Sequence, residues 1–71
     1  MESTIKEIGE DGLEISLMNG SLWLANIGDS TKSALWYSTQ RIKIEENSKG
    51  EYTLINLDTA EPDKIRVSRL L

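Results

Sequence analysis

Hydrophobic and polar residues alternate along most of this chain with a period of two residues. Leu13, Ile15 and Leu17, for example, alternate with Glu14 and Ser16. The same alternation returns in later segments, with turn-forming residues between them. A period of two is typical of strands with one buried face. The sequence therefore predicts an all-β protein, and we expect no helical segment.

Seven short strands follow from this alternation and from the turn signals that separate the runs. Their approximate ranges are 4–8, 12–18, 21–27, 34–37, 40–46, 51–57 and 64–70. The segment 34–37 has a second interpretation, as a turn of 3₁₀-helix. The turn signals are glycine, asparagine, aspartate and the single proline, which are the residues that favour reversals of the chain.

Chain length decides between the architectures that such strands can build. Short strands at this spacing form a sandwich or a barrel, and 71 residues are fewer than the ~100 of an immunoglobulin-type sandwich. An OB-like barrel usually carries a helix between its third and fourth strands, and this sequence predicts none. We therefore expect one domain, residues 1–71, folded as a small SH3-like barrel of roughly five or six short antiparallel strands, with an OB-like barrel as the alternative.

The Asn19-Gly20 pair between two alternating runs is a strong hairpin signal, and its loop length decides where Trp23 points. With a two-residue loop, the indole lies on the face opposite to Ile15. With a three-residue loop that begins at Met18, Ile15 pairs with Trp23 and the indole joins the core. We expect the three-residue loop, because a tryptophan is less often left on a solvent face.

The inward-facing positions of the predicted strands give the expected core. Its members are Ile5, Leu13, Ile15, Leu17, Trp23, Ile42, Ile44, Leu54, Ile65 and Val67. Because a protein this small buries only about 60% of the surface that its unfolded chain exposes, we expect modest stability.

Trp36 and Tyr37 are adjacent aromatic residues, and neighbours on a strand point to opposite faces. One of the two is therefore expected on the surface, beside the 28–33 loop. A surface aromatic there would give a contact for a partner protein, as aromatic side chains do in peptide-binding grooves. The structural alternative is that Trp36 caps the barrel core and Tyr37 rests on a neighbouring strand.

Four basic residues fall on the faces of two strands, Arg41 and Lys43 on one and Lys64 and Arg66 on the other. If the two strands lie near each other, the four cations form a patch for weak phosphate or nucleic-acid binding. The alternative is a solvated face whose cations have carboxylate partners on neighbouring strands.

The net charge of the chain is −4, and the first twenty residues hold the whole acidic excess, with five acids and one base. Non-specific nucleic-acid binding depends on cations that neutralise phosphates. The acidic total therefore argues against nucleic acid as the main partner.

The sequence contains no cysteine and no histidine. Disulfides, Cys-based metal sites and Ser-His-Asp or Cys-His sites are therefore excluded, and the commonest general base is missing. We expect no enzyme activity, no catalytic residues, no metal site and no cofactor. The chain shows no signal-peptide pattern and no apolar run of the ~20 residues that span a bilayer, so we expect a cytoplasmic protein without membrane contact.

A spaced set of residues runs through much of the chain. Its members are Gly12, Ile15, Leu17, Asn19, Gly20, Ser21, Trp23, Trp36, Ile42, Ile44, Tyr52, Leu54, Ile55 and Asn56. In this pattern the chain resembles a family of short uncharacterised bacterial proteins expected to be small SH3-like β-barrels, and the resemblance covers about residues 9–70. It implies a small β-barrel, and no activity or site residue follows from it.

These observations favour a non-catalytic protein-interaction module or a small accessory protein. We expect another protein as its partner, bound through the surface aromatic at position 36 or 37 or through an exposed strand edge. The alternative is a weak nucleic-acid-binding small β-barrel that uses the basic strand face described above. For the chain itself we expect a monomer or a homo-oligomer joined at strand edges.

Overall fold

The alternating segments of the sequence form the strands of a closed antiparallel β-barrel in the computed structural model, which describes residues 1–48, 50–60 and 62–71. The strands are β1 (Glu2–Ile8), β2 (Glu14–Leu17), β3 (Leu22–Ala25), β4 (Arg41–Ser48), β5 (Glu51–Asn56) and β6 (Asp63–Arg69). A short 3₁₀-helix, η1 (Ile27–Asp29), and a one-turn α-helix, α1 (Ser30–Ser33), lie between β3 and β4.

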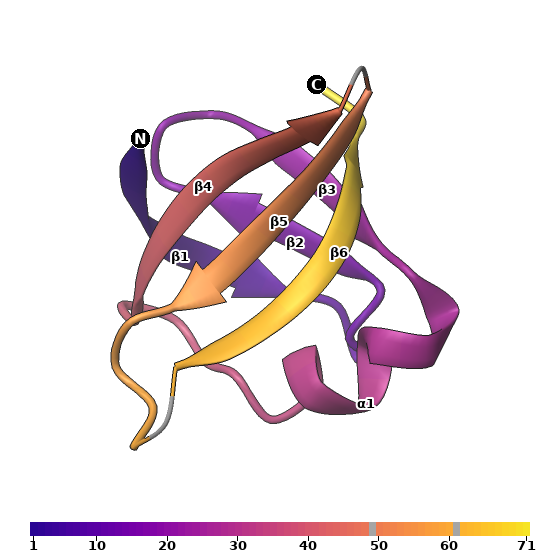
Figure 1. Cartoon of the computed structure of the whole chain (residues 1–71). Helices are drawn as coiled ribbons and strands as arrows, with labels where there is room; N and C mark the ends of the chain where they lie inside the picture. The colour runs from indigo at the N-terminus through magenta and orange to yellow at the C-terminus, as the bar shows by residue number, and fades with distance from the viewer. Residues whose placement is uncertain (49, 61) are drawn as a thin grey trace.

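The strands follow one another around the barrel in the order β1-β2-β3-β6-β5-β4, and β4 closes the barrel against β1. Figure 1 shows β4, β5 and β6 in front of β1, β2 and β3, with α1 beside the lower end of the barrel. Closure gives each described strand a neighbour on both sides. The pairing of β1 with β4 covers only residues 41–43 of β4, so part of that strand edge stays open, and a homo-oligomer joined at strand edges stays a prediction.

The all-β barrel and six of its expected strands are confirmed, but two expectations for the segment between β3 and β4 were wrong. Residues 34–37 form no strand, because the chain there leaves α1 in a turn. The helix α1 was not expected, because four residues are too few to display a 3.6-residue period. A helix between the third and fourth strands also removes the reason for preferring an SH3-like barrel to an OB-like one.

The hairpin between β2 and β3 has the expected three-residue register, in which Ile15 pairs with Trp23. Gly20 has a φ of 90°, a left-handed conformation that glycine adopts without steric cost. Asn19 Oδ1 accepts hydrogen bonds from the backbone N–H and the hydroxyl of Ser21, and Ser21 Oγ accepts one from Trp23 Nε1 at 2.8 Å. The turn residues therefore fix the position of the indole that enters the core.

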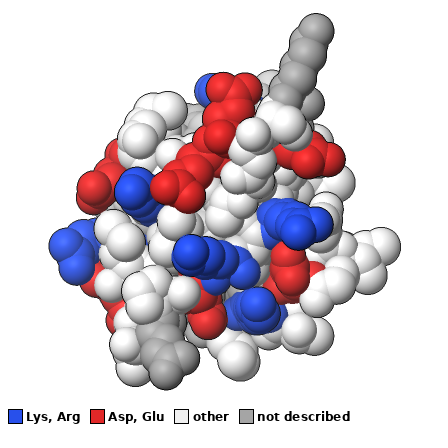
Figure 2. Space-filling model, viewed as in Figure 1, with Lys and Arg blue, Asp and Glu red and all other residues white. Residues whose placement is uncertain are grey.

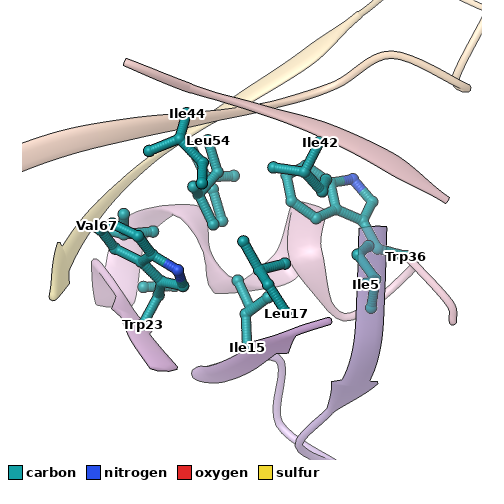
Figure 3. Packing of buried hydrophobic residues seen from close by; sticks show 11 residues of the cluster. Ile5, Ile15, Leu17, Trp23, Trp36, Ile42, Ile44, Leu54 and Val67 are labelled. Carbon is teal, nitrogen blue, oxygen red and sulfur yellow. The ribbon is translucent and has the colours of Figure 1, made fainter. Parts of the chain in front are cut away.

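The core is a cluster of buried apolar side chains supplied by both halves of the barrel. It contains Ile5, Ile15, Leu17, Trp23, Ala25, Trp36, Ile42, Ile44, Leu54, Ile65 and Val67. Nine of the ten expected core residues are among them, and the exception, Leu13, is half-buried. Figure 3 shows the two indoles at opposite sides of the cluster, with aliphatic side chains between them.

Candidate functional site

Trp36 and Tyr37 follow α1, and their side chains have opposite environments. The Trp36 side chain is 4% exposed and belongs to the core, and its Nε1 donates a hydrogen bond to Asp63 Oδ2 at 3.4 Å. The Tyr37 side chain is 65% exposed. Tyr37 is therefore the surface aromatic of the pair. Trp36 is not available to contact a partner, because its indole fills one end of the core.

The segment 26–40, which we call the β3–β4 connection, exposes three large apolar side chains. Ile27 is 84% exposed and Leu35 is 80% exposed, in addition to Tyr37. The other exposed large apolar residues are Met1, Met18, Leu24, Leu70 and Leu71. Three of those five lie at the ends of the chain. Exposed apolar side chains are typical of interaction surfaces when they gather in one region, and three of the largest fall within this one segment, so the connection is the candidate surface for a partner.

Buried amide side chains hold the end of the β3–β4 connection against β5. Asn56 Nδ2 donates to Gln40 Oε1 at 2.8 Å, and the backbone N–H of Tyr37 donates to the same oxygen at 3.0 Å. Asn56 is fully buried and Gln40 is 6% exposed. Asn56 Oδ1 also accepts a hydrogen bond from the Asp58 N–H at 2.9 Å. The backbone of Tyr37 is thus fixed to the barrel while its ring remains outside.

The middle of the connection packs on the backbone of Gly12. The buried Ser33 hydroxyl donates to the Gly12 carbonyl oxygen at 2.6 Å. Gly12 has a φ of 77°, and a Cβ there would lie 2.6 Å from Ala34 N and still closer to the carbonyl oxygen of Ser30. Only glycine permits this approach, so α1 is seated directly against the turn before β2.

A strained backbone occurs near the end of the connection, at Thr39. Its φ of 74° is rare for a β-branched residue. The Thr39 N–H donates to the Ile5 carbonyl, and the Ile5 N–H donates to the Gln40 carbonyl, both at 2.9 Å. Strain of this kind persists where the surrounding contacts determine the conformation. The segment that carries Tyr37 therefore has one defined shape.

The four basic residues of the predicted strand face do share one outer surface, because β4 and β6 lie on either side of β5. The strand register places Lys43, Ile55 and Lys64 in one row across the three strands. Ile55 is only 7% exposed although it points away from the core cluster. Figure 2 shows basic side chains interleaved with acidic ones on this face of the molecule.

Two of these four cations have carboxylate partners. Arg41 Nε and Nη2 donate to Asp58 Oδ1 at 3.0 and 2.8 Å, and the Arg41 backbone N–H donates to Asp58 Oδ2 at 2.8 Å. These hydrogen bonds raise the pKa of Arg41 and lower the pKa of Asp58. Lys43 Nζ lies 3.5 Å from Glu45 Oε2. On the β4 side of the face, the two cations are therefore solvent-exposed and paired with carboxylates, as expected for a solvated face and not for a phosphate-binding patch.

Lys64 and Arg66 instead line a groove between β6 and the β3–β4 connection. Its volume is about 480 Å³. The lining residues are Asn26, Gly28, Asp29, Lys32, Thr53, Lys64, Ile65 and Arg66. Asp29 Oδ2 accepts the Arg66 backbone N–H at 3.0 Å, and the Asn26 N–H donates to the Arg66 carbonyl at 2.9 Å. These bonds fix the two walls of the groove relative to each other.

The groove contains a third cation, Lys32 of α1, which sequence reasoning did not connect with Lys64 and Arg66. Nothing in the alternating pattern shows that a residue in the loop after β3 will face β6. In the part of the chain that the structure describes, the ion pairs are Arg41–Asp58 and Lys43–Glu45. The three cations of the groove therefore have no carboxylate within ion-pair distance among those residues.

Residues 1–48, 50–60 and 62–71 provide neither a cluster of metal ligands nor a membrane-spanning helix. Acidic side chains there form no group of three or more that is placed to hold a metal ion. None of the helices in those ranges has the length and apolar character needed to cross a membrane.

The chain matches no protein-family model, no curated protein and no solved structure. The resemblance to a bacterial family therefore stays a prediction, but the residues that carry it have structural roles here. Ser21 positions Trp23, and Gly12 seats α1. Trp36 fills the core, and Asn56 is part of the buried amide network. These residues of the spaced set build the barrel, so a function has to be inferred from the residues on its surface.

Proposed function

We propose that this protein is a small, non-catalytic interaction module that binds a partner protein through the β3–β4 connection. The observation that carries the proposal is the exposure of Ile27, Leu35 and Tyr37 on one connection. Burial of apolar surface is the main favourable term in protein association, and tyrosine is enriched at interfaces.

The energetics indicate a weak complex if these three side chains act alone. Full burial of each contributes about 1.5–3 kcal/mol, whereas the loss of translational and rotational freedom costs about 4–15 kcal/mol. Because Asn56 and Gln40 hold the connection in place, little further ordering is needed when the partner binds. A tight complex requires additional contacts around the apolar side chains.

Affinity capture from the host lysate tests this function. The bait is the tagged protein, in parallel with Leu35→Ser, Tyr37→Ser and the matched control Met18→Ser, which changes a side chain 59% exposed outside the connection. We expect the wild type and Met18→Ser to retain the same protein, and Leu35→Ser and Tyr37→Ser to lose it. Equal capture by all four baits would refute the proposed surface.

The weak nucleic-acid-binding alternative has support only on the β6 side of the basic face, where Lys64 and Arg66 are unpaired within the described residues. Arg41 and Lys43 have carboxylates beside them, which reduces their attraction for phosphate. A nuclease-treated half of the same lysate distinguishes the two functions. Protein capture that survives nuclease supports the interaction module, and capture that disappears supports the nucleic-acid alternative.

A further inference from the structure

We propose that the groove between β6 and the β3–β4 connection binds the phosphate group of a small phosphomonoester. This site uses charged side chains, whereas the function proposed above uses Ile27, Leu35 and Tyr37. A negative result for one proposal therefore leaves the other unaffected.

The charge of the groove is the first argument. Lys32, Lys64 and Arg66 contribute three positive charges, and Asp29 is the single carboxylate among the lining residues. The groove thus has a net charge of +2 in a protein whose total is −4. A phosphomonoester carries a charge of about −1.5 to −2 at pH 7 and presents three acceptor oxygens. Its charge and its acceptors match the three cationic donors.

The arrangement of the donors is the second argument. Lys64 and Arg66 lie two residues apart on one face of β6, about 6.6 Å along the strand, and Lys32 comes from the opposite wall. A guanidinium can donate two parallel hydrogen bonds to phosphate, and an ammonium acts as a compact point charge. Asn26 and Thr53 are also among the residues that line the groove, and both residue types have neutral side chains that can form hydrogen bonds.

The rigidity and size of the groove are the third argument. One Asp29 oxygen accepts the Arg66 N–H, and this bond fixes the end of η1, directly before α1, against β6. The lining residue Gly28 has open space around it, so no side chain obstructs that wall. The groove is open to solvent, and its volume of about 480 Å³ leaves room for a small organic group beside the phosphate.

A terminal phosphate fits this groove better than a nucleic-acid strand does. Sequence-tolerant single-strand binders combine an extended basic groove with aromatic rings on which bases stack. The described residues that line this groove include no aromatic ring. Beyond it, on β4, the cations are Arg41 and Lys43, which have carboxylates beside them.

Amide chemical-shift titration of the ¹⁵N-labelled protein with glycerol 3-phosphate tests the site. We expect saturable shifts for residues 28–32 and 64–66, and about tenfold weaker binding in each of Lys32→Gln, Lys64→Gln and Arg66→Gln. Lys43→Gln is the matched control, because it removes a cation from the same outer face but outside the groove. It should change the affinity by less than about twofold.

Two further probes define the ligand class. Glycerate carries a singly charged carboxylate where glycerol 3-phosphate carries its phosphorylated CH₂ group, and it should bind much more weakly than glycerol 3-phosphate. An eight-residue oligothymidylate should bind no better than the phosphomonoester. The proposal is overturned if glycerol 3-phosphate causes no saturable shifts at these amides, if Lys43→Gln weakens binding as much as the groove variants do, if glycerate binds equally well, or if the oligonucleotide binds more tightly.

Discussion

Asn56 Nδ2 donates a hydrogen bond to Gln40 Oε1 at 2.8 Å, and both side chains are buried. Asn56 ends β5, and Gln40 ends the β3–β4 connection. The same Gln40 oxygen accepts the backbone N–H of Tyr37. The most exposed aromatic side chain of the described surface is therefore tied to the barrel interior through a buried amide pair.

Replacement of Asn56 by alanine should lower the free energy of unfolding by about 2–3 kcal/mol, because the Gln40 and Asp58 groups that it pairs with are left without their partner. Urea denaturation measures this loss. Asn47→Ala is the control: its Nδ2 donates to Thr53 Oγ1 on the exposed surface, and its loss should stay within about 0.5 kcal/mol. Similar losses in both variants would show that the buried pair has no special role.

Gly12→Ala should destabilise the fold by more than about 2 kcal/mol, since the new Cβ would clash with the backbone of α1 and the left-handed conformation would be strained. Gly28→Ala is the matched control, because a Cβ at position 28 would have no other atom within 4 Å. Its effect should be within about 1 kcal/mol and of either sign. Thermal unfolding of the two variants in the same buffer measures the difference in stability. Equal melting temperatures would contradict the close packing of α1 on Gly12.

Thr39→Asn should raise the free energy of unfolding by about 1 kcal/mol, because asparagine tolerates the left-handed backbone better than a β-branched residue does. The change leaves the backbone hydrogen bonds of this turn in place. Urea denaturation compares it with Thr31→Asn, which alters an exposed threonine of α1 and should be close to neutral. A destabilised Thr39→Asn variant would mean that the threonine side chain has a stabilising contact.

The Arg41–Asp58 pair predicts a particular dependence of stability on pH. Hydrogen bonds from Arg41 lower the pKa of Asp58 below its ordinary value of 3.8. A lowered folded-state pKa gives stability that is present above the unfolded-state pKa and is lost as pH falls through the folded-state pKa. The gap in unfolding free energy between the wild type and Asp58→Asn should thus hold steady near neutral pH and shrink below 3.8.

Urea denaturation over a series of pH values measures this gap. In the Arg41→Gln background the effect of Asp58→Asn should be smaller and should lose most of its dependence on pH. A gap that widens as pH falls would have the wrong sign for this ion pair.

Much of the barrel follows from the sequence because its strands alternate so regularly. The Asn19-Gly20 turn signal, together with the preference of tryptophan for burial, was sufficient to predict that Ile15 pairs with Trp23. The alternating pattern does not predict burial where tertiary contacts, and not the two-residue period of a strand, bury a side chain. Trp36 is buried after a turn and not on a strand, and Ile55 is buried on the outer face of the barrel.

The candidate surfaces were harder to predict because they depend on the β3–β4 connection. Its single helical turn, Ser30–Ser33, contains residues that are poor helix formers, and it is held by the Ser33–Gly12 hydrogen bond. The fold alone brings Lys32 to the groove beside β6. The sequence left open whether the four cations form a phosphate-binding patch or a solvated, paired face; they share one outer face, and Arg41 and Lys43 are paired with Asp58 and Glu45.

Site-specific photo-crosslinking in the host cell tests most directly whether the β3–β4 connection is a binding surface. The photoreactive amino acid p-benzoylphenylalanine replaces Tyr37 in one strain and Met18 in another, both of which are exposed positions. We predict that irradiation gives a discrete protein adduct from position 37 and none of that mass from position 18. An absence of adducts at position 37, or the same adduct from both positions, would contradict the proposed binding surface.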